Sequence, residues 1–180
     1  MSWFPVFMLL LGSAITVFIG AIENRRTLKR DREAREDARR DKLLEYRNEF
    51  QRDSLVQLQE AMFELGRATT LIHMHNKRSY AKTGEWHQQM YPEEINERER
   101  AAHGRTAMLV VRVRDDKVRE LVQEFKDIAI QATMSSESKE EADRRMRQLQ
   151  KKHVEMNQRI GELLRTLHDE ETKMLEAPKK

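Results

Sequence analysis

The segment 142–167, ADRRMRQLQKKHVEMNQRIGELLRTL, decides the fold class because it carries the clearest periodic pattern in the chain. Its seam positions alternate in steps of four and three, at Ala142, Met146, Leu149, His153, Met156, Ile160, Leu163 and Leu167. This spacing places about one side chain per turn on a single helical face, as in helices that pack side by side. The segment predicts a helix over about 138–175, which begins with a capping box formed by Ser138 and Glu141. His153 would be a buried polar residue that specifies register.

Two earlier stretches carry the same kind of pattern. The first places its seam residues in steps of three and four, at Leu55, Leu58, Met62, Leu65, Thr69 and Ile72. It predicts a helix over about 43–83, and Gly84 suits the left-handed residue that ends it. The second begins at Pro92, which is tolerated in a first turn, and predicts a helix over about 92–133. Its apolar residues are Met108, Val111, Val118, Leu121, Phe125, Ile128 and Ala132.

Three predicted helices of about 40 residues, each about 60 Å long, with short connections fit an antiparallel three-helix bundle over 43–180. The chain of 180 residues contains only 6 Gly and 3 Pro, which argues against a loop-rich sandwich or barrel. The predicted fold class is therefore all-α. A helical hairpin that completes its bundle with a second copy shows the same pattern, so both arrangements remain open.

The N-terminal region is apolar. No charged side chain occurs in the 20 residues from Trp3 to Ile22. At about 1.5 Å per residue, such a helix matches a hydrocarbon core of about 30 Å. Residues 1–22 are therefore predicted to be a transmembrane anchor. A cleaved signal peptide is the alternative, but such peptides begin with a basic segment and nothing basic precedes Glu23.

Small residues recur on one face of this predicted anchor, at Gly12, Thr16 and Gly20. Small side chains at this spacing let two membrane helices approach closely. The pattern favours pairing of the anchor with an identical or different membrane helix. The alternative is that short runs of small residues arise by chance.

The segment that follows the anchor is strongly charged. Its first basic residues are Arg25, Arg26, Lys29, Arg30 and Arg32. Because basic residues concentrate on the cytoplasmic side, they predict a single-pass protein of the inner or plasma membrane with its N-terminus outside. The bulk of the chain would be cytoplasmic. Residues 23–42 are predicted to form a charged helical stalk, with a disordered linker as the alternative.

The sequence contains no recognisable catalytic chemistry. It has no Cys, no nucleophile motif and no glycine-rich phosphate loop. His73 and His75 are two residues apart and would point to nearly opposite helix faces, so they do not predict a metal site. No enzyme activity, cofactor, metal or small-molecule substrate is therefore expected. The net charge of +3 is too small for nucleic-acid binding by bulk charge.

The polar loop between the first two predicted helices is unusually aromatic. It contains Tyr80, Trp86, His87, Met90 and Tyr91. Aromatic residues in a surface loop often anchor a partner, so the loop is a candidate partner-binding site. The alternative is that these side chains cap the open end of the bundle.

These patterns predict a membrane-anchored helical scaffold or adaptor that presents a cytoplasmic bundle to a protein partner or forms a homo-oligomer. One alternative is a subunit of an oligomeric membrane effector or pore, assembled through the small-residue face of the anchor. Another is a sensor of anionic lipid or nucleic acid that acts through the basic juxtamembrane residues.

Overall fold

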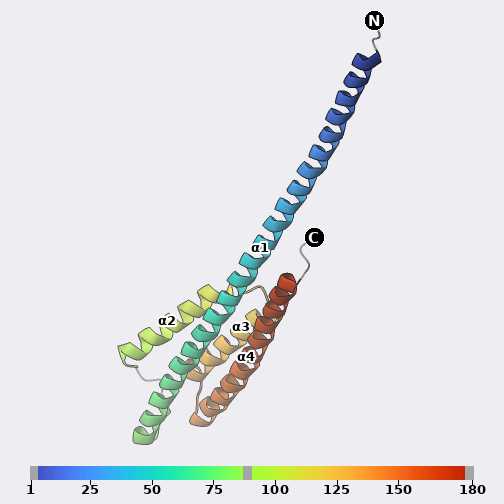
Figure 1. The fold of residues 1–180 in the computed structure, drawn as a ribbon. Helices are drawn as coiled ribbons and strands as arrows, with labels where there is room; N and C mark the ends of the chain where they lie inside the picture. Colours follow the sequence, from blue (N-terminus) through green and yellow to red (C-terminus); the bar gives the residue numbers. More distant parts are fainter. Residues whose placement is uncertain (1–3, 87–90, 177–180) are drawn as a thin grey trace. The chain divides into compact units, whose positions relative to one another are not determined.

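The computed structural model describes the backbone of residues 4–86 and 91–176 and the side chains of residues 24–86, 91–173 and 176. Over these residues it contains four helices and no strand (Figure 1). They are α1 (Phe4–Thr83), α2 (Glu93–Val110), α3 (Asp116–Met134) and α4 (Lys139–Glu176). The predicted all-α class is confirmed.

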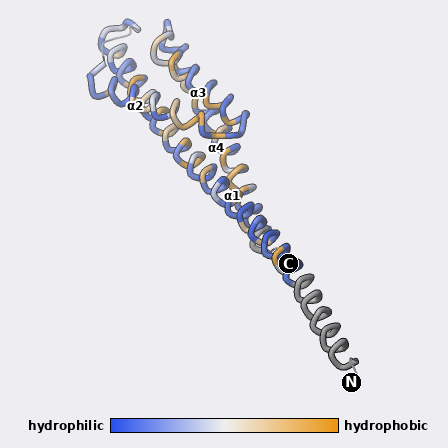
Figure 2. The backbone as a smooth tube through the Cα atoms, turned by 90° about the horizontal axis from the view of Figure 1, so that it is seen from above, coloured by the Kyte–Doolittle hydropathy of each residue, from blue (hydrophilic) through white to orange (hydrophobic). Residues whose placement is uncertain are grey.

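The chain divides within α1 into two compact units, Met1–Arg47 and Asn48–Lys180. In the first unit, residues 24–47 are helical and every side chain is exposed. Interspersed charges support this polar helix through local pairs, such as Lys29 with Glu33 at 3.8 Å. In the second unit, hydrophobic residues recur among hydrophilic ones along the helices, which is typical of amphipathic elements (Figure 2).

Among the described residues, none of the helices combines the length and the apolar character needed to cross a membrane. The predicted anchor lies outside the residues whose side chains the structure describes. The same is true of its small residues Gly12, Thr16 and Gly20.

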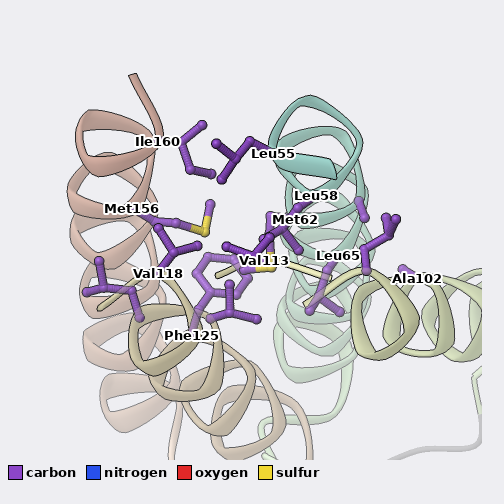
Figure 3. Packing of buried hydrophobic residues seen from close by; sticks show 14 of the residues in the cluster. Leu55, Leu58, Met62, Leu65, Ala102, Val113, Val118, Phe125, Met156 and Ile160 are labelled. Carbon is purple, nitrogen blue, oxygen red and sulfur yellow. The ribbon is translucent and has the colours of Figure 1, made fainter. Parts of the chain in front are cut away.

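The core of the second unit is built from the predicted seams. Leu58, Met62 and Leu65 of α1 are fully buried, and they face Phe125 of α3 and Met156 of α4 (Figure 3). The seam residues Leu55, Thr69, Ile72, Ala142, Leu149 and Ile160 are also buried. The periodicity of the first and third predicted helices is thus confirmed from Leu55 onward.

Helix α4 runs antiparallel to the second-unit part of α1. Asn48 lies near the start of that part and donates to the Glu170 carboxylate at 3.5 Å. At the other end, His73 contacts Asp143 at 2.8 Å. Because low residue numbers on α1 meet high numbers on α4, these two long helices run antiparallel. In the predicted antiparallel three-helix bundle the first and third helices would run parallel, so that arrangement is wrong.

The predicted single helix over 92–133 is wrong, because the structure breaks it into α2 and α3. Asp115 caps α3 by accepting a hydrogen bond from the Val118 backbone N–H at 2.8 Å. The connection is further held by Gln51, whose side chain donates to the Arg112 carbonyl at 2.9 Å and accepts from the Arg114 N–H at 3.1 Å. Over residues 48–86 and 91–176 the bundle therefore contains four helices rather than the predicted three.

This break changes which residues are buried. Met108 and Val111 were predicted on the seam, but they are 63% and 75% exposed. The buried positions are instead Ala102, Thr106, Leu109 and Val113. Because α2 ends at Val110, the residues on the two sides of the break do not share one heptad register. A pattern extended through the break therefore predicts the wrong face of α2 to be buried.

The predicted helix ends are largely correct. Gly84 has a φ of 73°, and its N–H donates to the Tyr80 carbonyl at 2.9 Å. The Glu141 N–H donates to the Ser138 hydroxyl at 3.2 Å. Pro92 precedes the first residue of α2 instead of occupying its first turn.

Candidate functional site in the groove between α1 and α4

An open groove of about 600 Å³ lies between α1 and α4 in the second unit. Phe63 and Leu71 line it from α1, and Met146 and His153 line it from α4. Phe125 contributes from α3. Phe125 is buried in the core, so the groove reaches down to the edge of the bundle interior.

Gly66 shapes the groove where α1 passes over Phe125. A Cβ atom at this position would lie 3.5 Å from the Cζ atom of Phe125, at ordinary van der Waals distance. Glycine is unfavourable in the middle of a helix by about 1 kcal/mol relative to alanine. At this position its lack of a side chain leaves the space above the ring open.

The groove is mostly apolar. Phe63 is 57% exposed, although a phenylalanine normally favours burial. Its ring centroid lies 6.5 Å from that of His153, which in turn lies 5.9 Å from the ring of Phe125. Burial lowers the pKa of His153, so this ring is neutral near pH 7 and extends the apolar surface.

The rim of the groove is basic. Arg67 on α1 and Arg147 on α4 both line it and are exposed. Across the described part of the chain, neither guanidinium has an ion-pair or hydrogen-bond partner. By contrast, Arg98 and Arg105 of α2 are paired with carboxylates of α1 at 3.0 and 3.2 Å. The groove thus presents two uncompensated cations.

A polar cluster borders the groove at Asp143. The Oδ1 atom of Asp143 accepts from His73 Nε2 at 2.8 Å and from Lys77 Nζ at 3.4 Å. Burial works to raise the pKa of Asp143, but the hydrogen bonds from His73 and Lys77 outweigh it and the pKa is lowered. Burial likewise lowers the pKa of His73, against the effect of Asp143. A neutral imidazole that donates to a carboxylate fits both shifts, and this carboxylate is therefore already partnered.

The predicted partner-binding loop contacts the end of the bundle. Trp86 donates from Nε1 to the Ser136 carbonyl at 3.2 Å and packs edge-on against Tyr80 at 6.0 Å. The Tyr91 hydroxyl accepts from Asn76 at 3.1 Å and donates to Thr133 at 3.4 Å.

These contacts fit the alternative that the aromatic residues cap the bundle. A partner role for the loop stays a prediction. His87 and Met90 lie outside the described residues.

The other predicted site residues are not among those that line the groove. Arg25, Arg26, Lys29, Arg30 and Arg32 belong to the first unit and are exposed. In the described ranges, no group of three or more His, Asp or Glu side chains is placed to hold a metal ion. His73 and His75 point toward different neighbours, since His75 packs edge-on against Tyr91 at 5.6 Å.

The sequence patterns described above did not predict this groove. Its signal is a second set of positions on α1, Phe63, Gly66 and Thr70, that recurs at helical spacing outside the main seam. Comparison of the chain with protein families, curated proteins and solved structures gave no match.

Proposed function

We propose that the chain is a membrane-anchored helical adaptor whose bundle binds a protein partner through the groove between α1 and α4. The observation that carries this proposal is the exposure of Phe63 in an open apolar groove with two uncompensated arginines. Exposed apolar surface with a polar rim is typical of interaction sites. No catalytic motif in the sequence competes with this interpretation.

The anchor part of the proposal rests on sequence. The segment from Trp3 to Ile22 is uncharged, and basic residues follow it closely. The helix α1 begins at Phe4 and runs to Thr83, so one element contains the apolar segment and one wall of the groove. In this proposal the anchor fixes the location and the bundle supplies the binding surface on the cytoplasmic side.

Fractionation of cells that express the full chain tests the anchor. We expect the chain in the membrane pellet after an alkaline wash and in the soluble fraction only after detergent. Protease added to intact cells should leave the bundle uncut. A matched variant with Leu10→Arg and Val17→Arg should move to the supernatant, because each central arginine opposes insertion by about 3 kcal/mol. Alkali-extractable wild-type chain, or a bundle cut from outside, would overturn the proposal.

Site-specific photo-crosslinking in native membranes tests the adaptor role. A photoreactive residue in place of Phe63 should give one discrete crosslinked species. The matched control replaces Met108, which is similarly exposed but lies on α2 outside the groove. The same heterogeneous crosslinked products from positions 63 and 108 would indicate only random collisions and would argue against a defined partner.

A further inference from the structure

We propose that the groove between α1 and α4 takes an amphipathic helix whose apolar stripe is flanked by carboxylates on both sides. This inference rests on the adaptor function proposed above and specifies the chemistry of the partner. It follows from the shape of the groove and from the position of its two arginines.

The walls of the groove are two antiparallel helices in a fixed register. Gln59 donates to Asn157 at 3.0 Å and His73 contacts Asp143 at 2.8 Å. In both pairs the residue numbers sum to 216, so residues with this sum face one another across the pair. Arg147 is therefore level with position 69, two residues from Arg67. Arg67 and Arg147 therefore extend from nearly the same height on opposite walls.

The apolar surface between the arginines has the length of a short helical contact. It extends on α1 from Phe63 to Leu71 and on α4 from Met146 to His153. Those spans correspond to about 12 Å at 1.5 Å per residue, or about two turns. A helix that presents apolar residues at i, i+3 or i+4, and i+7 covers such a surface.

The charges select an acidic partner. Arg67 and Arg147 lack carboxylate partners among the described residues, and the Asp143 carboxylate is already bound by His73 and Lys77. Guanidinium groups pair well with carboxylates, whereas a basic helix would place like charges together. The groove therefore favours carboxylates over amines on the flanks of its occupant.

The two-sided placement of charge favours a helix over an anionic lipid. A fatty acid carries its charge at one end of the acyl chain and reaches one arginine at a time. An amphipathic helix carries side chains on both flanks of its apolar stripe and reaches both walls. The geometry thus points to a protein segment.

The test uses the full chain in nonionic detergent micelles and three labelled helical peptides of about 18 residues. The first peptide has a leucine stripe flanked by glutamates. The second has lysines in place of the glutamates, and the third keeps the glutamates but has glutamines in place of the leucines. Fluorescence anisotropy at about 0.15 M salt, with protein-free micelles as the blank, reports binding. We expect the first peptide to bind roughly tenfold more tightly than either of the others.

Two double variants separate the groove from general charge. Arg67→Glu with Arg147→Glu should reverse the preference, so that the lysine peptide binds better. Arg144→Glu with Arg165→Glu makes the same change in net charge on exposed positions of α4 outside the groove and should leave the preference unchanged. Phe63→Ala should weaken the glutamate peptide roughly tenfold. Circular dichroism checks that each variant remains folded.

Several results would overturn the proposal. These are equal binding of all three peptides, a preference that survives Arg67→Glu with Arg147→Glu, and binding of octanoate but of no peptide. Dimerisation through the groove without peptide binding would also overturn it, because the occupant would then be a second copy. Because the full chain is kept in micelles, the peptide-binding measurement does not depend on whether residues 1–22 insert into a membrane. A soluble location in cell fractionation would overturn the proposed membrane function, but the peptide-binding measurement would still test the groove.

Discussion

One carboxyl group, that of Asp115, both caps α3 and binds Arg159 of α4. Its Oδ1 atom accepts from the Val118 N–H at 2.8 Å, and its Oδ2 atom accepts from Arg159 Nη2 at 2.6 Å. The hydrogen bond from Arg159 is the main reason that the pKa of Asp115 is lowered. Asp115 therefore fixes the start of α3 and its place against α4 at the same time.

Replacement of Asp115 should destabilise the bundle in two separable steps. Asp115→Ala removes the cap and the ion pair and should reduce the free energy of unfolding by about 2 kcal/mol. Asp115→Asn keeps a capping oxygen and should cost about 1 kcal/mol or less. Urea unfolding of the full chain in micelles, followed by circular dichroism, measures both. Equal losses for the two variants would show that capping contributes nothing at this position.

Gly66→Ala should stabilise the chain by about 1 kcal/mol while it narrows the groove. The new methyl group would meet Phe125 at 3.5 Å, which is ordinary contact, so helix propensity decides the sign. Gly104→Ala on α2 is the matched control, since a Cβ atom added there would meet nothing within 4 Å. It should give a similar gain in thermal unfolding. A loss of stability at Gly66 alone would mean that Phe125 cannot accommodate the methyl group.

Stability should fall as the pH drops below about 6.5, because burial lowers the pKa of His73, His103 and His153. Below their ordinary pKa of 6.5, these groups take up protons in the unfolded chain before they do so in the folded chain. His153→Leu should flatten this dependence, and His168→Leu removes an exposed histidine as the control. Thermal unfolding between about pH 7.5 and pH 5.5 measures it. An unchanged slope in His153→Leu would contradict the prediction.

Glu99→Gln should stabilise the chain at neutral pH. Burial raises the pKa of Glu99 above its ordinary 4.5, and the residue is only 8% exposed. Below pH 4.5 the Glu99 carboxyl is protonated in both the folded and the unfolded chain. As the pH rises above 4.5 the carboxyl ionises first in the unfolded chain, so the free energy of unfolding falls until the pH passes the higher pKa of the folded chain. The gain from Glu99→Gln should therefore appear above this range and shrink toward about pH 4.5.

The exposed residue Glu97 on the same helix provides the comparison. Glu97→Gln should change the free energy of unfolding by less than about 0.5 kcal/mol. A gain from Glu99→Gln that is constant with pH would exclude the loss of a buried charge as its cause.

The sequence predicted the all-α class and the buried seams of the two long helices, because seam residues such as Leu58 and Met156 recur at fixed spacing and are buried for that reason. It failed at 111–115, where one Asp115 side chain and the amide of Gln51 outweigh a pattern that spans both sides of the break. The groove was missed because its arginines lie on helices far apart in the sequence. Only the antiparallel register of α1 and α4 brings Arg67 and Arg147 level.

The inner face of α2 buries polar groups and is therefore held to the bundle less strongly than that of α3. It buries Glu99 and the hydroxyl of Thr106, which has no hydrogen-bond partner among the described residues. By contrast, α3 buries Val118, Leu121, Val122 and Phe125. Local unfolding begins where buried apolar surface is smallest. Amide protons of α2 should therefore exchange with solvent well before those of α3, so α2 should detach from the bundle before α3 does.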